Sequence, residues 1–140
     1  MAKTLVTTED PEAAIPEWFD EFGSLVADVA YEPAKGLVAD DVVSFGTKAE
    51  LVEGLDHLVS QQWMGIWPYI EDFRFVDVRT VPTDGGAWAA ATWCSTGFHE
   101  DGTPFDRPGR ATIAFERRDG RWLAVHTHFS LDPGTPQETY

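Results

Sequence analysis

Two histidines near the end of the chain have types and a spacing that could support chemistry. His126 and His128 are separated by one residue in a run of strand-forming residues, so both imidazoles should project from the same face of one strand. Two such histidines can share a zinc or iron ion, and an imidazole can carry a proton near neutral pH. A metal would need a third ligand, and no spacing brings His99, Glu100 or Asp106 to that strand. We therefore predict no metal and keep a metal-dependent lyase or hydrolase as a third alternative.

The strand that carries these histidines belongs to a predicted hairpin. Residues 109–130 form two strand-like runs around Asp119-Gly120, which is the strongest short-range signal for a hairpin. Loops of two or three residues are both open, and they differ by one residue in register. We favour the three-residue loop, which pairs Arg117 with Arg121, because it separates an apolar face from a polar one. The apolar face would hold Ala111, Ile113, Phe115, Leu123, Val125, Thr127 and Phe129. The outer, polar face would hold Arg110, Thr112, Ala114, Glu116, Trp122, Ala124, His126, His128 and Ser130.

The rest of the chain reads as helices followed by strands. Helices are predicted over 11–29, with Pro16 as a kink or restart, over 33–38 and over 49–63. Strands are predicted over 42–45, 73–78 and 88–98, in addition to the closing hairpin. This order predicts an α+β protein, in which three N-terminal helices pack on one face of a curved antiparallel β-sheet.

The composition indicates a single folded domain with an acidic surface. A chain of 140 residues with 43% apolar content can bury a core, which we place at about residues 11–131 of one domain, with flexible ends. Asp and Glu outnumber Lys and Arg by 24 to 10, and this charge of −14 repels nucleic acid and anionic membranes. No apolar run approaches the ~18 residues of a membrane span, and we expect no signal peptide. The single cysteine, Cys94, allows no internal disulfide and favours a cytoplasmic protein.

Two stretches of the sequence resemble a known superfamily. LVADDVVSF at residues 37–45, with RRDGRW at 117–122 and VHTHFS at 125–130, resembles the nuclear-transport-factor-two-like (ketosteroid isomerase-like, cystatin-like) superfamily, and especially its SnoaL-like members. The closing hairpin is also similar to the association domain of the calcium/calmodulin-dependent kinases. The resemblance implies a cone of three helices and a strongly curved sheet around an apolar pocket, and dimers that form through the outer sheet face. Because this fold hosts unrelated functions, it implies no single activity.

The known catalytic groups of these relatives do not recur in this sequence. Counted without gaps, the tyrosine, the base and the second acid of the isomerases fall on Phe22, Gly46 and Ile113. None of these side chains can move a proton. The cyclase aspartate also falls on Ile113, and the arginines with which the kinase domain grips a carboxylate fall on Ile113 and Phe129. The resemblance therefore predicts the fold without its familiar chemistry.

The implied pocket would be lined mainly by aromatic side chains. We expect its wall to consist of Phe22, Phe45, Gln62, Trp63, Trp67, Tyr69, Trp88, Ile113, Val125, Thr127 and Phe129. Such a pocket would bind a small apolar or aromatic molecule, unless the rings simply fill it. The implied dimer interface would consist of Arg110, Trp122, His126 and His128.

Two functions remain open, and neither needs a cofactor. The first is binding of a small apolar or aromatic molecule, with isomerisation, cyclisation, dehydration or hydrolysis if the domain is catalytic. The candidate proton carriers are Tyr69, His126 and His128, and they would require a register other than the favoured one. The alternative is a non-catalytic oligomerisation or ligand-sensing module, which the missing carboxylates favour. The expected partners are a small molecule and a second copy of the chain, with no nucleic acid and no membrane.

Overall fold

The computed structural model describes residues 9–48 and 50–140, and its first element is a long helix. α1 spans Pro11–Ala27 and begins where the sequence predicts, because the Asp10 side chain accepts a hydrogen bond of 3.0 Å from the backbone N–H of Glu12. The predicted restart at Pro16 is wrong, since α1 continues through this residue. A short second helix, α2 (Tyr31–Lys35), follows. The end predicted to be flexible at residues 1–9 lies almost entirely outside the described residues.

The third helical region begins and ends later than predicted. It consists of α3 (Leu55–Leu58), the π-helical turn η1 (Val59–Trp63), α4 (Met64–Ile66) and the 3₁₀ turn η2 (Trp67–Tyr69). The residues before it form a short strand, β2 (Val52–Glu53), and Gly54 turns the chain into the helix with a φ of 90° that favours glycine. A π-helical turn changes the direction of the side chains that follow it. Gln62 and Trp63 come from this turn, and both are buried.

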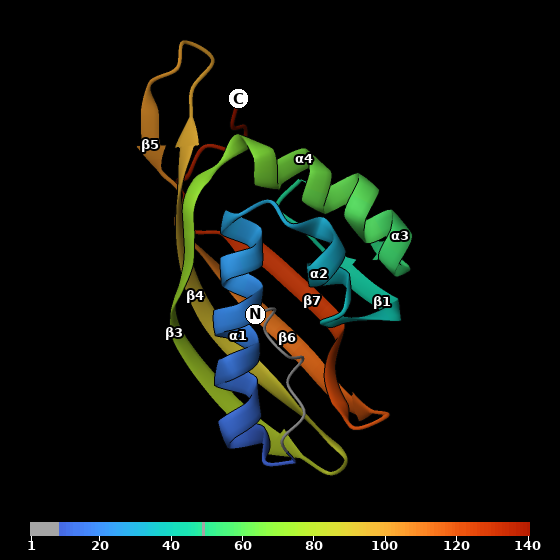
Figure 1. Ribbon diagram of the computed structural model, residues 1–140. Coiled ribbons are helices and arrows are strands. Elements are labelled where there is room, and N and C mark those ends of the chain that lie inside the picture. The colour runs from blue at the N-terminus through green and yellow to red at the C-terminus, as the bar shows by residue number, and fades with distance from the viewer. Residues whose placement is uncertain (1–8, 49) are drawn as a thin grey trace.

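Within the described residues, seven strands form one curved sheet. Besides β2 they are β1 (Val38–Phe45), β3 (Glu71–Thr83), β4 (Gly86–Phe98), β5 (Pro104–Asp106), β6 (Gly109–Arg118) and β7 (Arg121–Leu131). The order is β2-β1-β7-β6-β4-β3, with β5 paired to β4. All pairs are antiparallel except β1 with β7, which is parallel. Figure 1 shows α1 lying along the hollow side of the sheet and the α3–η2 run crossing one end of it. The predicted α+β class with a curved sheet is therefore confirmed.

The turn of the closing hairpin differs from the favoured prediction. Asp119 and Gly120 have φ angles of 51° and 76°, and they form a two-residue loop with Arg118 opposite Arg121. The predicted three-residue loop, with Arg117 opposite Arg121, is wrong. The left-handed conformation of both loop residues matches the twist of the two strands, which explains the preference for Asp-Gly here.

Beyond this turn, a bulge in β7 shifts the pairing of β6 with β7 by one residue. Ala124 pairs with Phe115, but His126 pairs with Ala114, so Val125 is an extra residue on the β7 side. The bulge turns Trp122 and Ala124 toward the core, where Trp122 is 4% exposed. The predicted position of both residues on the outer face is therefore wrong. Beyond the bulge the predicted faces hold: Thr127 points inward, and His126 and His128 lie on the outer face.

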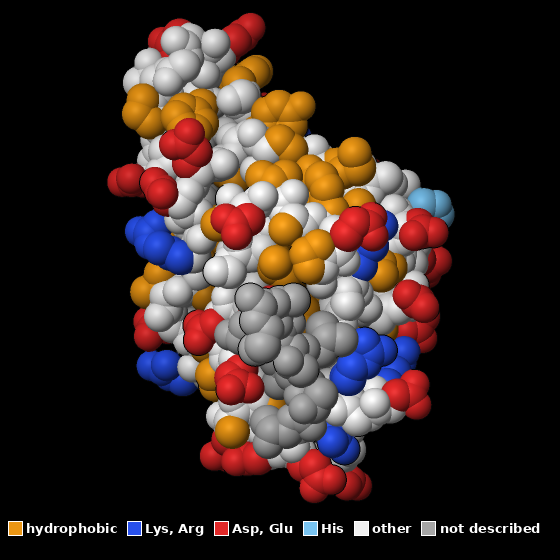
Figure 2. Space-filling model, viewed as in Figure 1, with side chains coloured by type: hydrophobic (Ala, Val, Ile, Leu, Met, Phe, Trp, Pro, Cys, Tyr) orange, Lys and Arg blue, Asp and Glu red, His pale blue; other side chains and the backbone are white. Residues whose placement is uncertain are grey.

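The core lies between α1 and the hollow face of the sheet, and it is rich in aromatic rings. The Trp18 ring stacks on Phe22 and meets Phe115 edge-on, and its indole N–H donates a hydrogen bond of 2.9 Å to the Leu37 carbonyl. Acidic side chains are scattered over the face shown in Figure 2 without forming one patch. None of the helices in the described part of the chain has the length and apolar content needed to cross a membrane.

Candidate functional site

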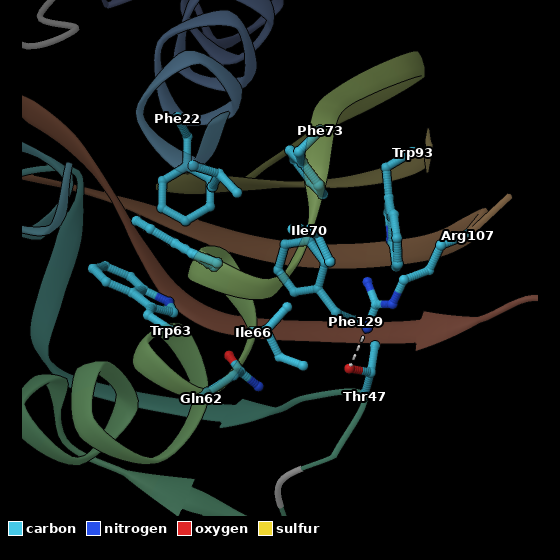
Figure 3. A pocket seen from close by; sticks show the side chains of 12 residues that line it. Phe22, Thr47, Gln62, Trp63, Ile66, Ile70, Phe73, Trp93, Arg107 and Phe129 are labelled. Atoms are coloured by element: carbon cyan, nitrogen blue, oxygen red, sulfur yellow. Dashed lines mark hydrogen bonds between the residues drawn. The ribbon is translucent and has the colours of Figure 1, made fainter. Parts of the chain in front are cut away.

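A small cavity lies between α1, the helical run 55–69 and the hollow face of the sheet (Figure 3). Its volume is about 40 Å³. The lining residues are Phe22, Val26, Thr47, Gln62, Trp63, Ile66, Trp67, Ile70, Phe73, Trp93, Arg107 and Phe129. An apolar cavity of about 150 Å³ is the size that accommodates a benzene ring. The cavity is therefore large enough for water molecules or one polar group, but not for an aromatic ring.

Aromatic side chains occupy most of the cone around this cavity. The rings of Trp63 and Trp67 are stacked, with centroids 4.5 Å apart. Phe22 meets them edge-on at 5.7 and 5.8 Å, and Tyr31 stacks on the other side of Trp67 at 5.4 Å. Aromatic rings prefer these stacked and edge-to-face arrangements, so the four rings form a well-packed wall beside the cavity. The space that remains lies toward the polar side chains.

The polar centre of the cavity is a buried arginine. Arg107 lies between β5 and β6, where its backbone N–H and carbonyl both pair with Ser95 at 2.9 and 3.0 Å. Its side chain is turned inward and is only 1% exposed. One guanidinium nitrogen donates a hydrogen bond of 3.0 Å to the hydroxyl of Thr47, and the group lies 5.4 Å from the centroid of the Trp93 ring.

No carboxylate compensates the charge of Arg107 within the described part of the chain. None of the ion pairs there includes this residue. Burial alone lowers the pKa of the guanidinium from its usual range to about 10, because the charged form is poorly solvated. The group still carries its proton at neutral pH. The cavity thus holds a buried positive charge that has one neutral hydrogen-bond acceptor.

Three buried N–H donors at the cavity have no hydrogen-bond partner among the described residues. They are Nε2 of Gln62, Nε1 of Trp93 and Nε of Arg107. Buried polar groups are normally paired, and an unpaired one costs roughly 1–3 kcal/mol. In Figure 3 the amide nitrogen of Gln62 is turned toward the side on which Thr47 and Arg107 lie. The residues that line this small space thus carry three unpaired donors and one positive charge.

Two glycines make this arrangement possible. A Cβ atom at Gly46 would overlap with the amide group of Gln62, so only glycine leaves room for this side chain to reach the cavity. A Cβ atom at Gly109 would likewise overlap with the indole of Trp93. Gly46 is also the position on which the isomerase base falls. In this chain the amide of Gln62 therefore occupies the space next to that position.

The predicted proton carriers do not reach the cavity. The Tyr69 side chain is 46% exposed, and its carbonyl accepts a hydrogen bond of 2.7 Å from the Thr139 hydroxyl. His126 lies on the outer sheet face, where its Nδ1–H donates to the Val43 carbonyl at 2.7 Å. His128 lies on the same face, and the Phe45 ring contacts both imidazoles. No group of three His, Cys, Asp or Glu side chains suited to a metal occurs among the residues described.

The structure brings together five of the residues predicted to line the pocket. Phe22, Gln62, Trp63, Trp67 and Phe129 surround the cavity. The other six lie elsewhere: Phe45, Tyr69 and Trp88 are exposed, Val125 is the bulge residue, and Ile113 and Thr127 are buried beside other core groups.

Two of these six residues lie on the outer face of the sheet and point away from the cavity. Phe45 and Trp88 are 40% and 42% exposed, because they occupy outward positions of β1 and β4. Thr127 points inward, but its hydroxyl forms a short hydrogen bond with Ser44 between β7 and β1. Sequence reasoning missed Val26, Thr47, Ile66, Ile70, Phe73, Trp93 and Arg107.

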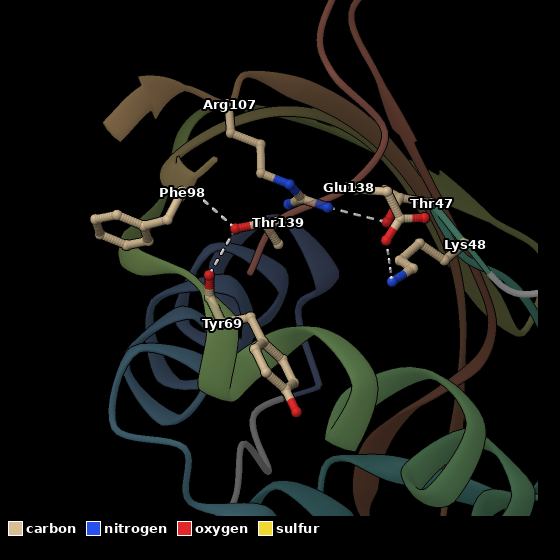
Figure 4. A network of polar contacts seen from close by, with 7 residues as sticks. All are labelled: Thr47, Lys48, Tyr69, Phe98, Arg107, Glu138 and Thr139. Atoms are coloured by element: carbon tan, nitrogen blue, oxygen red, sulfur yellow. Dashed lines mark hydrogen bonds and ion pairs between the residues drawn. The ribbon is translucent and has the colours of Figure 1, made fainter. Parts of the chain in front are cut away.

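A polar network borders the cavity next to Arg107 (Figure 4). The Thr139 hydroxyl donates to the Tyr69 carbonyl and accepts from the Phe98 backbone N–H at 2.8 Å. Lys48 follows Thr47 and forms an ion pair of 2.9 Å with Glu138. The segment 132–140, which the sequence predicts to be a flexible end, is therefore attached to the fold, and the backbone N–H of Tyr140 also donates to the Phe98 carbonyl at 2.9 Å.

The fold and the sequence together define the family. The model of the SnoaL-like domain matches residues 15–133, and the chain therefore belongs to the SnoaL-like domain family. The predicted resemblance is thus confirmed. No curated protein is similar enough in sequence to match.

Solved structures show the same architecture at low sequence identity. A protein from Xanthomonas campestris classed as a calcium/calmodulin-dependent protein kinase II association domain is 23% identical, with a TM-score of 0.74 over 96% of this chain and 99% of that one. A cystatin-like fold protein from Caulobacter vibrioides is 18% identical, with a TM-score of 0.75 over 89% and 91%. A ketosteroid isomerase-like protein from Erwinia carotovora atroseptica is 15% identical, with a TM-score of 0.73 over 92% and 100%. These similarities establish the fold.

Proposed function

We propose that this SnoaL-like domain binds a small organic acid, with the carboxylate in the cavity beside Arg107. The observation that carries the proposal is that three buried N–H donors without a partner among the described residues belong to side chains that line one cavity. A carboxylate offers about four acceptor sites and a negative charge, which are what these donors and Arg107 lack. The apolar part of the acid would lie toward the mouth of the cavity, against Ile66 and Ile70.

Binding fits the cavity better than catalysis does. Among the described residues that line it, none carries a carboxylate, an imidazole or a thiol. General acid–base chemistry needs a group that changes its protonation state near neutral pH. The pKa of Arg107 is about 10, so its guanidinium holds its proton while it binds an anion. We therefore propose a ligand-sensing role for the domain.

Butyrate and butyramide form a matched pair of probes for this proposal. The two molecules have nearly the same shape, and only the acid carries a charge. Titration followed by NMR of the indole N–H of Trp93 should show saturable binding of butyrate, at least tenfold tighter than that of butyramide. In Arg107→Met the preference for butyrate should disappear. Equal binding of the two probes would overturn the proposal and favour an apolar pocket without an anion site.

A second candidate function is self-association through the outer sheet face. Phe45, Val81 and Trp88 are exposed there, at 40, 37 and 42% of their surfaces, and His126 and His128 lie beside them. Exposed apolar groups that lie on one face commonly mark an interface. The names of similar solved structures include an association domain, which supports the same proposal. Of the four predicted interface residues, Trp122 is buried in the core and is no part of this surface.

A further inference from the structure

A larger cleft lies next to the cavity beside Arg107 and shares two of its lining residues. This cleft, of about 280 Å³, is lined by Lys48, Gln61, Gln62, Gly65 and Ile66. Gln62 and Ile66 line both spaces, so the two spaces are neighbours. Thr47 and Lys48 are consecutive residues, and Thr47 lines the inner cavity while Lys48 lines the outer cleft. Lys48 therefore brings a second positive charge to the cleft that adjoins the cavity.

The charge of Lys48 is currently balanced by a residue from the segment 132–140. Its ammonium group forms an ion pair of 2.9 Å with the Glu138 carboxylate. The two side chains are 37% and 56% exposed, so water solvates both of them. An ion pair of this kind contributes little to stability and can be exchanged at small cost. A ligand carboxylate in the cleft could therefore take the place of Glu138.

We propose that the site takes a dicarboxylate, with one carboxylate on Arg107, Trp93 and Gln62 and the second on Lys48 in exchange for Glu138. This inference rests on the proposed function, since it assumes that the inner cavity binds an acid. It adds the chemical class of the ligand: a short, flexible diacid whose middle methylene groups lie against Ile66. The two positions differ in burial, because Arg107 is 1% exposed whereas Lys48 is at the surface. The inner carboxylate would contribute most of the affinity, and the outer one would contribute selectivity.

Glutarate and valerate test this inference, because both have five carbon atoms and only glutarate has a second carboxylate. We would measure the ratio of their affinities by calorimetry, in the full chain and in variants. In the natural chain glutarate should bind about two- to fivefold tighter than valerate, which is the strength of a half-exposed ion pair. Lys48→Gln should lower this ratio to about one. Glu138→Gln should raise the affinity ratio, because Lys48 then has no ion pair with Glu138 that the ligand must displace.

The possible results separate the two proposals. If both acids bind with the same affinity and Lys48→Gln leaves their ratio unchanged, the dicarboxylate inference is overturned while the binding of acids at Arg107 stands. If neither acid binds, both proposals fall. A ratio that falls in Lys48→Gln but does not rise in Glu138→Gln would overturn the exchange with Glu138. Circular dichroism of both variants shows whether they are folded, and each substitution is of an exposed side chain that the core does not need.

Discussion

The amide group of Gln62 fills the space that any side chain at position 46 would need. A Cβ atom at Gly46 would overlap with the amide, and it would lie 2.8 Å from Cγ of Gln62. Gly46 is also where a gapless count from the isomerases places their catalytic base. The chain therefore has a hydrogen-bond donor beside the position where those relatives have a carboxylate. This difference agrees with the proposal that the cavity binds an anion.

The first prediction uses this relationship directly. In Gly46→Ala the new methyl group should displace the Gln62 amide from the cavity, because the far end of a flexible side chain moves more easily than backbone. Butyrate affinity should then fall about 10- to 150-fold, the loss of one hydrogen bond to a charged group. The free energy of unfolding should stay the same or rise by up to about 1 kcal/mol, since alanine reduces the entropy of the unfolded chain. Calorimetry and denaturant titration measure the two effects.

A double-mutant cycle provides the control for this prediction. Gln62→Leu should weaken binding as much as Gly46→Ala does, and the double variant should be no weaker than either single variant. Additive losses would show that Gly46 acts independently of Gln62. Gly109→Ala should behave differently, because its Cβ would overlap with the indole of Trp93 and with the backbone carbonyl of Ser130. It should lower the free energy of unfolding by more than about 2 kcal/mol.

The second prediction concerns the cost of the buried charge. Arg107→Met should raise the free energy of unfolding by about 1–3 kcal/mol, because methionine keeps the volume and removes a buried charge that has no counter-ion among the described residues. The same variant should lose the binding of carboxylates. Denaturant titration gives the stability, and Arg107→Lys serves as a control that retains the charge. If Arg107→Met is less stable than the natural chain, the arginine is a structural residue and not one kept for binding.

The third prediction follows from the pKa of about 10 for Arg107. Only the protonated guanidinium attracts an anion, so butyrate affinity should be constant up to about pH 9 and fall about tenfold per pH unit above pH 10. In the unfolded chain the pKa of this guanidinium is higher, so the unfolded chain holds the proton more tightly than the folded chain. Relative to Arg107→Met, the stability of the natural chain should therefore rise as the pH increases above about 10. Calorimetry across this range tests the first statement, and an affinity that is unchanged at pH 11 would contradict it.

Helical periodicity and the family resemblance predicted one side of the cavity. Phe22 lies on the apolar stripe of α1, and the family cone implies that Trp63 and Trp67 close its open end. The local sequence around Arg107 gave no comparable signal. Asp106-Arg107-Pro108 reads as a polar turn, and the burial of Arg107 depends on its pairing with Ser95, which is distant in sequence. Tertiary pairing, rather than local pattern, decides which polar residue is buried.

Trp88 shows why the aromatic pattern of a strand can mislead. It alternates with Ala87 and Ala89, and the usual expectation is that the ring faces the core. In the structure the two alanines face inward and Trp88 is exposed. The aromatic rings of α1, such as Trp18 and Phe19, already fill the space above β4 and β6, so small residues are needed beneath them. The composition of the helix thus determines which face of the strand is buried.

The fourth prediction concerns the outer face that Trp88 shares with Phe45. Trp88→Lys should shift the protein toward the monomer in sedimentation velocity, because a charge at the centre of an apolar interface is poorly solvated. Leu51→Lys is the matched control, since Leu51 is 54% exposed and is not part of the outer sheet face. This substitution changes the net charge by the same amount, and it should leave the oligomeric state seen in sedimentation velocity unchanged. A natural chain that is monomeric at all concentrations would contradict self-association.

The fifth prediction concerns Thr139, which joins the segment 132–140 to two distant parts of the fold. Its hydroxyl accepts from the Phe98 backbone N–H and donates to the Tyr69 carbonyl, and the residue is 6% exposed. Thr139→Val has nearly the same shape and loses both bonds, which leaves the N–H of the half-buried Phe98 without this partner. The free energy of unfolding should fall by about 1–3 kcal/mol, while Thr139→Ser should stay within about 1 kcal/mol of the natural chain. Hydrogen exchange at the Phe98 amide should accelerate in the valine variant alone. If exchange and stability are the same in both variants, the segment does not stabilise the fold through Thr139, and its ion pair at Lys48 would be its main attachment beside the cavity.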